Sequence, residues 1–379
     1  MSRQPALWPS PAEALRAETP DQPLLCFSPA VLQATFRRFR DGFPGLVTYA
    51  VKANDARMVI ENLVAAGMTA FDVASPDEMR RVRDVLPGAV LHYNNPVRSR
   101  AEIAEAVAIG VASCSVDCET ELAKLAQGGL PRGTEVSARL RLPVKGGAYD
   151  FGAKFGADPA ACADLLRAIV AAGYSPAITF HPGTQCADPE AWRAYIEAAA
   201  AVARDAGVRI GRLNVGGGFA ARRVGAGPDI KAAFATIADA TRRAFGPDAP
   251  ALVCEPGRAM VADCMTLATR VKAVRRDGTV FLNDGIYGGL AEMPVMGMTD
   301  RLSIVDAQGR PRQGPLRPRI VFGPTCDSLD RLPGEVPLPA DIVEGDYLLV
   351  HGMGAYSTAT LTRFNGYGDL RVVTVEQAG

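Results

Sequence analysis

The segment SPAITFHPGTQCADPEAWRAYIEAAAAVARDAG (175–207) decides the fold of this chain. It opens with a short run of β-forming residues, SPAITF (175–180), and passes through the small and polar residues HPGT (181–184). An alanine-rich stretch follows, PEAWRAYIEAAAAVARDAG (189–207), which is typical of a helix and ends in glycine, a common helix terminator. The segment therefore predicts one strand–helix unit, with polar residues placed where the strand ends.

The same unit recurs along the chain between about Leu46 and Ala262. Helical segments such as 101–110 and 159–173 separate the apolar runs, and we count eight runs in all. Eight successive units favour a closed (β/α)8 barrel, a parallel sheet covered by helices, over an open doubly wound sheet. The other seven runs are LVTYAVKAN (46–54), TAFDVAS (69–75), AVLHYNNP (89–96), ASCSVD (112–117), EVSARLRLPV (135–144), RIGRLNVGGGF (209–219) and ALVCEPGRAMVA (251–262).

The pattern changes after about Cys264. Short strand-like segments now alternate with connections rich in proline and glycine, such as GRPRQGPLRP (309–318). This pattern predicts a mostly antiparallel β domain. We therefore expect a barrel over 27–262 and a β domain over 263–379, which part of 1–26 joins.

Composition narrows the class of protein. The 379 residues contain 41 Lys+Arg and 41 Asp+Glu, so the net charge favours neither nucleic acid nor an anionic membrane as a partner. The N-terminus lacks the apolar core of a signal peptide, and no run of about 18 apolar residues predicts a membrane span. Three histidines and scattered cysteines argue against a zinc site, and eight cysteines in so long a chain indicate reduced thiols in the cytoplasm.

The active site of a (β/α)8 barrel lies at the carboxyl ends of its strands. Reading the end of each run gives a ring of polar residues with varied chemistry, together with a glycine triplet. The ring consists of Lys52, Asn54, Asp72, Ser75, Asn94, Asn95, Asp117, Arg141, His181, Gly216, Gly217, Gly218, Glu255 and Arg258.

Two features of this ring suggest a phosphorylated cofactor that reacts with an amine. Lys52 lies in an apolar run, where a desolvated lysine with a lowered pKa suits covalent bonding to a carbonyl group, although a lysine at a strand end can also extend to solvent. Gly216, Gly217 and Gly218 follow the seventh run, where barrels commonly bind phosphate, and Arg258 follows the eighth. A glycine triplet can also be an ordinary loop.

Three further residues each allow a chemical and a structural interpretation. Glu255 at a strand end needs a cation, which could be a protonated pyridine nitrogen or the guanidinium of Arg258 or Arg141. His181 could stack on a flat cofactor or belong to the core. Cys326, in the polar turn GPTCDSLD (323–330), could be a reactive thiol or an inert one.

The chain resembles the fold-type III pyridoxal-phosphate decarboxylases, the group that contains ornithine and diaminopimelate decarboxylases and shares its barrel with alanine racemase. Nine motifs carry the resemblance in order along most of the chain. They are YAVKAN (49–54), FDVASPDEM (71–79), LRLPV (140–144), FHPGTQ (180–185), NVGGGF (214–219), CEPGR (254–258), NDGIYGG (283–289), GPTCDSLD (323–330) and GAYSTATLTRFNG (354–366).

The resemblance implies pyridoxal 5′-phosphate as cofactor and assigns residues to it. Lys52 would form the Schiff base, Asp72 and Glu78 would support the lysine side, and His181 would stack on the pyridine ring. Glu255 would pair with the pyridine nitrogen, where racemase relatives place an arginine, so decarboxylation is favoured over racemisation. Arg141 would lie near the phenolic oxygen, and the phosphate would be bound by Gly216, Gly217, Gly218, Arg258, Tyr356 and Thr184.

The resemblance also implies a homodimer with shared active sites. Cys326 would reach the cofactor of the other subunit and protonate the α-carbon after CO2 leaves. Asp327 would face the distal ammonium of the substrate, and Tyr287 would line the same site.

Asp327 after Cys326 matches ornithine-type enzymes, whereas diaminopimelate-type enzymes carry glutamate there. We therefore expect L-ornithine as substrate and putrescine, a step of polyamine biosynthesis, as product. An ungapped count from Tyr287 reaches Met296 where ornithine-type enzymes carry a second acid; Glu292 and Asp300 are nearby. Lysine, diaminopimelate or a modified basic amino acid remains an alternative, and so does a regulatory homologue without activity.

Overall fold

The computed structural model describes residues 6–143, 154–222, 229–297 and 300–379. The chain divides into two compact units, one formed mainly by Phe36–Ala220 with Pro228–Ala259 and the other by Met1–Thr35 with Met260–Gly379. We call them the barrel unit and the β unit.

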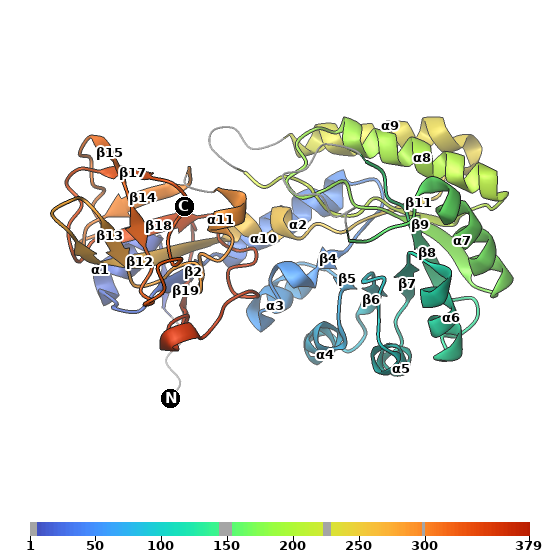
Figure 1. Ribbon diagram of the computed structural model, residues 1–379, viewed down its shortest axis with the longest axis horizontal. Coiled ribbons are helices and arrows are strands. Elements are labelled where there is room, and N and C mark those ends of the chain that lie inside the picture. Colours follow the sequence, from blue (N-terminus) through green and yellow to red (C-terminus); the bar gives the residue numbers. More distant parts are fainter. Residues whose placement is uncertain (1–5, 144–153, 223–228, 298–299) are drawn as a thin grey trace. The chain divides into compact units, whose positions relative to one another are not determined.

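The barrel unit contains the eight predicted strands in a parallel sheet that closes on itself (Figure 1). The first predicted strand is split at Thr48, whose N–H donates to Cys254 O (2.9 Å). As a result its first half pairs with the last strand and its second half with the next strand, which joins the two ends of the sheet. The strands are β3 (Leu46–Val47), β4 (Tyr49–Ala50), β5 (Ala70–Val73), β6 (Val90–Tyr93), β7 (Ser113–Val116), β8 (Glu135–Arg139), β9 (Ser175–Thr179), β10 (Arg212–Asn214) and β11 (Ala251–Cys254).

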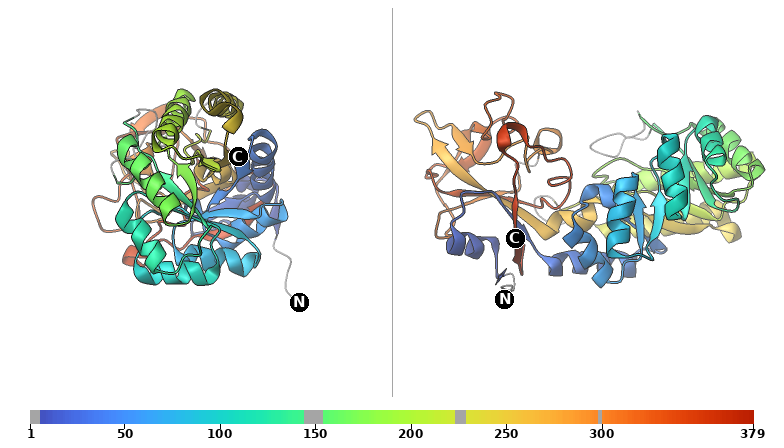
Figure 2. Two further views of the ribbon diagram at one scale, coloured as in Figure 1. Left: turned by 90° about the vertical axis from the view of Figure 1, so that its right-hand side faces the viewer. Right: turned by 90° about the horizontal axis from the view of Figure 1, so that it is seen from below.

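Helices surround this sheet, as the end-on view in Figure 2 shows. Their ends follow the sequence: α5 begins with a capping box between Ser99 and Glu102, and α8 ends at Gly207 in the left-handed conformation. The helices are α2 (Pro29–Gly42), α3 (Arg57–Ala65), α4 (Pro76–Val85), α5 (Arg100–Ile109), α6 (Glu119–Gln127), α7 (Pro159–Ala171), α8 (Glu190–Ala206), α9 (Ile230–Phe245) and α10 (Arg258–Val261). The predicted (β/α)8 barrel is confirmed.

An aromatic cluster fixes the helices to one part of the barrel. Phe219 follows β10, and its ring centroid lies 5.0 Å from that of Trp192 in α8, 5.5 Å from Phe39 in α2 and 5.7 Å from Phe234 in α9. All four side chains are buried. Such rings bury large apolar areas, so the cluster anchors the loop that begins with the glycine triplet.

The β unit is a mostly antiparallel sheet, as predicted. Its longest strand, β12 (Met265–Val274), pairs antiparallel with β2, β13 and β18. A core of Leu15, Leu24, Ala268, Tyr347 and Leu349 lies on one side of this sheet. The other strands and helices are β1 (Leu7–Trp8), α1 (Pro11–Glu18), β2 (Leu24–Phe27), β13 (Val280–Leu282), α11 (Met293–Met296), β14 (Leu302–Val305), β15 (Leu316–Arg319), β16 (Val321–Phe322), β17 (Val336–Pro339), β18 (Tyr347–His351) and β19 (Arg371–Val375).

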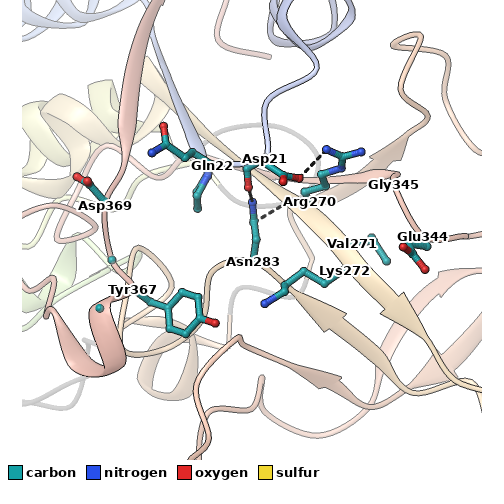
Figure 3. Close-up of a pocket in the computed structure, with 13 residues that line it drawn as sticks. Asp21, Gln22, Arg270, Val271, Lys272, Asn283, Glu344, Gly345, Tyr367 and Asp369 are labelled. Carbon is teal, nitrogen blue, oxygen red and sulfur yellow. Dashed lines mark hydrogen bonds and ion pairs between the residues drawn. The ribbon is translucent and has the colours of Figure 1, made fainter.

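A cavity of about 530 Å³ beside β12 shows how the N-terminal segment is attached to this unit (Figure 3). Asp21 Oδ1 accepts a hydrogen bond from Arg270 Nη1 (2.7 Å), and its backbone oxygen accepts one from Asn283 Nδ2 (2.6 Å). Asn283 Oδ1 in turn accepts from the N–H of Arg270 (2.7 Å). The segment before β2 is therefore tied to β12 by polar contacts as well as by strand pairing.

The sequence predicts neither a membrane-spanning helix nor a zinc site, and the described residues bear on both. Among them, no helix combines the length and the hydropathy that a membrane span needs. The same residues contain no group of three or more His, Cys, Asp or Glu side chains placed to hold a metal ion. All eight cysteines are free thiols.

His92 gives the barrel a specific sensitivity to acid. It is buried in β6, where Nδ1 lies 2.8 Å from Ser113 Oγ and Nε2 has no hydrogen-bond partner among the residues that the structure describes. Burial, and secondarily the charge of Arg212, lower the pKa of His92 to about 4. A depressed histidine pKa contributes stability that is present above pH 6.5, the ordinary value, and is lost as the pH falls toward 4.

We predict that His92→Asn reduces this loss. Wild-type protein should lose about 2 kcal/mol of unfolding free energy from this one residue between pH 7.5 and pH 5. The variant should lack that contribution, because asparagine can still bond to Ser113 and does not titrate. Urea unfolding of both proteins at the two pH values measures the difference, and equal losses in both proteins would contradict the prediction.

Candidate active site

A cavity of about 390 Å³ lies at the carboxyl ends of the barrel strands. Six residues of the predicted ring line it, and four of them, to which the resemblance assigns a role, each come from the end of a different strand. These are Lys52 after β4, Asp72 in β5, His181 after β9 and Glu255 after β11; the cavity is also lined by Val73, Ala74, Asn94, Asn95, Pro96, Arg139, Lys154, Phe155, Thr179 and Phe180.

Lys52 lies in the 3-10 turn Val51–Ala53, directly after β4, and not inside a strand. Its neighbours Val51 and Ala53 are buried, whereas its side chain is exposed at the cavity wall. Of the two arrangements that the sequence allowed, the structure therefore shows the lysine that extends from the strand end. Because the backbone turns here, the side chain of Lys52 does not follow the alternating side-chain directions of the strand. It lines the cavity instead, where a ligand can reach its amine.

The carboxylates of Asp72, which is buried, and Glu255, which is half-buried, are joined by one side-chain amide. Asn94 Nδ2 donates to Asp72 Oδ1 (3.0 Å) and to Glu255 Oε1 (2.6 Å), so a single amide joins the two acids. Asn214 Nδ2 also donates to Glu255 Oε1. Burial raises the pKa of both carboxyl groups, and for Asp72 the charge of Glu255 raises it further. The pair therefore favours a positively charged partner.

His181 is a neutral, flat donor at the cavity wall. Its Nδ1 accepts a hydrogen bond from the N–H of Gly183 (3.1 Å), so the neutral ring carries its proton on Nε2. Burial lowers the pKa of His181 well below its usual value, and the positive charges of Lys52 and Arg139 act in the same direction. An uncharged imidazole is suited to stacking on an aromatic ring.

Arg139, and not Arg141, is the arginine of this cavity. β8 ends at Arg139, whose Nη1 donates to Asn94 O (3.4 Å) and whose guanidinium interacts with Glu255 and Asp72. Arg141 is exposed, and its N–H bonds to Ala157 O (2.8 Å). The predicted role of Arg141 beside the cofactor therefore does not fit the structure, and Arg139 takes its place.

The glycine triplet packs closely against neighbouring backbone, where a side chain would collide. Gly216 and Gly218 have φ of +68° and +84°, which favour glycine. A Cβ on Gly217 would lie 2.6 Å from Glu255 O, and one on Gly218 would lie 2.3 Å from Gly183 O. These glycines therefore allow the loop after β10 to approach both the His181 loop and the end of β11.

The resemblance assigns three more residues to the cofactor phosphate or to the lysine side of the site, and each follows a barrel strand. Arg258 is buried at the start of α10, directly after the Glu255 turn. Thr184 is half-buried next to Gly183. Glu78 lies in the first turn of α4 and accepts a hydrogen bond from the N–H of Ala74 (2.8 Å), and burial raises its pKa.

The remaining predicted residues lie in the β unit. Tyr287 OH donates to Asp327 Oδ2 (2.5 Å), and the exposed Cys326 directly precedes Asp327. Tyr356 has a left-handed backbone, with φ of +58°. Met296 is buried in α11, while Glu292 is half-buried and Asp300 is exposed.

Comparison with known proteins places this site in a family. Residues 30–262 match the family of the pyridoxal-dependent decarboxylases, through the model of their pyridoxal binding domain. The chain belongs to this family. The ornithine decarboxylase of Panagrellus redivivus is 30% identical over 384 residues, which cover 92% of this chain and 84% of that protein. Antizyme inhibitor 2 of Xenopus laevis is also 30% identical, over 84% of this chain and 73% of its own length.

Solved structures give the same result. The arginine decarboxylase of Paramecium bursaria Chlorella virus superposes with a TM-score of 0.85 at 25% identity, over 95% of this chain and 98% of that one. The chain is thus a pyridoxal-phosphate-dependent amino-acid decarboxylase.

The residues present fit pyridoxal phosphate. Asp72 and Glu255, whose pKa values are raised, would accept a cation such as a protonated pyridine nitrogen, and Lys52 presents an amine to the cavity. When bound, the cofactor accepts the electron pair that is released when the substrate carboxylate leaves as CO2. His181 would lie against the ring, Glu255 would pair with the pyridine nitrogen, and Lys52 would supply the amine.

Asn94, Asn214 and Arg139 were not assigned roles from the sequence. Asn94 stood among the strand-end residues and Asn214 within NVGGGF, but an amide gives no chemical signal by itself. The signal that could have identified both is their position, because each lies at or next to the end of a strand, as Asp72 and Glu255 do. Arg139 lies two residues before the arginine that was chosen.

We predict that Glu255→Gln lowers kcat about 10²–10³-fold, because it removes the charge that keeps the pyridine nitrogen protonated. Glutamine retains an oxygen for Asn94 and Asn214, so the fold and cofactor binding should persist. Steady-state assays and the cofactor absorbance of the purified variant measure both effects. A decrease in kcat of less than about threefold would show that Glu255 has only a structural role.

Proposed function

We propose that this enzyme decarboxylates L-ornithine to putrescine, as in polyamine biosynthesis. The observation that carries the proposal is the placement of Asp327. Its Oδ1 accepts from the N–H of Leu329 (2.9 Å) and its Oδ2 from Tyr287 OH, and these bonds lower its pKa. Asp327 is therefore a fixed and ionised acceptor, which suits the ammonium at the far end of a diamino acid.

The proposal includes a cytoplasmic homodimer in which Cys326 of one subunit serves the cofactor of the other. Cys326 and Asp327 lie in an exposed loop of the β unit, which supports a role at a subunit interface. Cys326 would donate the proton that the α-carbon takes up after CO2 has left. Eight free thiols agree with a reducing compartment.

The length of the substrate is the open choice within the basic amino acids. Met296 is buried and uncharged, so it does not supply the second carboxylate that ornithine-type enzymes carry at this position. Lysine, diaminopimelate or a modified basic amino acid is therefore the alternative. A distal group with a different position or charge would depend less on that carboxylate.

A substrate panel combined with Asp327→Asn tests the proposal. We expect kcat/KM to be highest for L-ornithine, and to fall about 10–100-fold in the variant because a charge-assisted hydrogen bond is lost. L-norvaline, which has the same chain without the ammonium, should react equally poorly with both proteins. A higher kcat/KM for lysine, arginine or diaminopimelate would overturn the assignment to ornithine.

The similarity to antizyme inhibitor 2 raises a second candidate, a regulatory protein without activity. Lys52, Glu255 and Cys326 are all retained, which argues against it. We predict that the purified protein shows the cofactor absorbance and that borohydride reduction fixes the cofactor covalently on Lys52. Mass spectrometry of the peptide that contains Lys52 measures the adduct. A protein that neither binds pyridoxal phosphate nor forms the adduct would be the regulatory homologue.

A further inference from the structure

The loop Gly323–Asp330, which we call the cysteine loop, is fixed at its base by a buried carboxylate. Asp330 Oδ2 accepts hydrogen bonds from the N–H of Thr325 (3.0 Å) and from its hydroxyl (2.8 Å). Asp330 Oδ1 accepts one from the N–H of Ile286 (2.9 Å), in the turn that carries Tyr287. The side chain of Asp330 is 1% exposed, so these bonds are shielded from water. Asp330 thus joins the cysteine loop to the Tyr287 turn.

A second attachment reaches Cys326 itself. The N–H of Cys326 donates to Oδ1 of Asn365 (3.2 Å), which is 39 residues away in the sequence. The segment around Asn365 also contacts Tyr287. Thr362 donates to Tyr287 O through its N–H (3.0 Å) and its hydroxyl (2.7 Å), and the rings of Phe364 and Tyr287 lie 4.9 Å apart.

We propose that Asn365 is a positioning residue for the Cys326 thiol, an inference that rests on the proposed role of Cys326 as proton donor. Asp327, the next residue, is held by Tyr287 and by its own turn. The bond from Asn365 to the N–H of Cys326 anchors the chain on the other side of the cysteine. With both sides anchored, the direction of the Cα–Cβ bond, and hence of the thiol, is restricted.

Asn365 is also suited to its backbone conformation, and this offers a simpler explanation for its presence. It has φ of +53° and ψ of +18°, in the left-handed region that asparagine tolerates better than most residues. Glycine adopts this conformation at least as easily, but has no side-chain oxygen. Aspartate tolerates it and retains an oxygen. The two explanations therefore predict different results for Asn365→Gly and Asn365→Asp.

The fate of the proton measures the position of the thiol. In the normal reaction the amino acid takes up one proton at the α-carbon and yields CO2 and the amine. If the proton instead arrives at the carbon of the cofactor that bears the substrate nitrogen, the nitrogen stays with the cofactor. Water then hydrolyses the bond between that nitrogen and the substrate carbon, so the amino acid and pyridoxal phosphate, with one proton, yield CO2, an aldehyde and pyridoxamine phosphate overall. No external oxidant is needed, because the cofactor gains the electrons that the substrate carbon loses.

The experiment compares Asn365→Gly, Asn365→Asp and Cys326→Ala in the holoenzyme. The ratio of aldehyde to amine is measured with the best substrate of the panel, together with pyridoxamine phosphate. We expect this ratio to rise about tenfold in Asn365→Gly, toward the value of Cys326→Ala, and to stay near the wild-type value in Asn365→Asp. A wild-type ratio in Asn365→Gly would overturn the proposal, because glycine preserves the turn and removes only the side-chain bond.

A second measurement is independent of turnover. In a Cys118→Ser background, which removes the other exposed cysteine, the rate at which iodoacetamide alkylates Cys326 reports the freedom of the thiol. We expect this rate to change at least about threefold in Asn365→Gly and not in Asn365→Asp. If no basic amino acid is decarboxylated but the alkylation rates differ in this way, the proposed function fails and the positioning of Cys326 stands. Equal alkylation rates in all variants would overturn the positioning.

Discussion

The site depends on two hydrogen bonds that Asn94 donates, one to Asp72 and one to Glu255. Two carboxylates held by one amide in a buried position repel each other, and neutral donors cannot cancel their charge. The nearby cations, Lys52 and Arg139, each lower the pKa of Glu255. A protonated pyridine ring supplies the further positive charge that this arrangement favours. Asp72 and Glu255 would thus favour a cofactor whose ring carries a positive charge.

This arrangement requires the barrel to be closed. Asp72 and Asn94 come from the neighbouring strands β5 and β6, whereas Glu255 follows β11, at the other end of the strand order. The split at Thr48 brings these ends together, because β3 pairs with β11 and β4 with β5. The turn that follows β4 then places Lys52 at the cavity. A local break in one strand therefore serves both closure and chemistry.

The sequence predicted the barrel well because its signal is repeated and local. Each strand-end residue is placed by the same rule, which correctly brought Asp72, His181 and Glu255 into one cavity. The rule fails where a strand ends early. β8 stops at Arg139, so Arg141 lies beyond the strand and packs next to Gly156, which has φ of +109°. Likewise the 3-10 turn at Lys52 breaks the alternation, and no pattern of apolar residues reports such a turn.

In the β unit, local sequence patterns predict much less. Its chemistry depends on contacts between turns that are far apart in the sequence, such as those of Asp330 with Ile286 and of Asn365 with Cys326. Periodicity cannot predict these contacts, and only the motifs shared with the family indicated that the residues matter. The two units therefore position their side chains in different ways. Strand ends fix the side chains of the barrel cavity, while loops joined by a few polar bonds fix Asp327 and Cys326, for which we propose roles at the distal ammonium and in the final protonation. Loops can change without loss of the barrel core, so substrate choice can diverge in this family while the decarboxylation chemistry is kept.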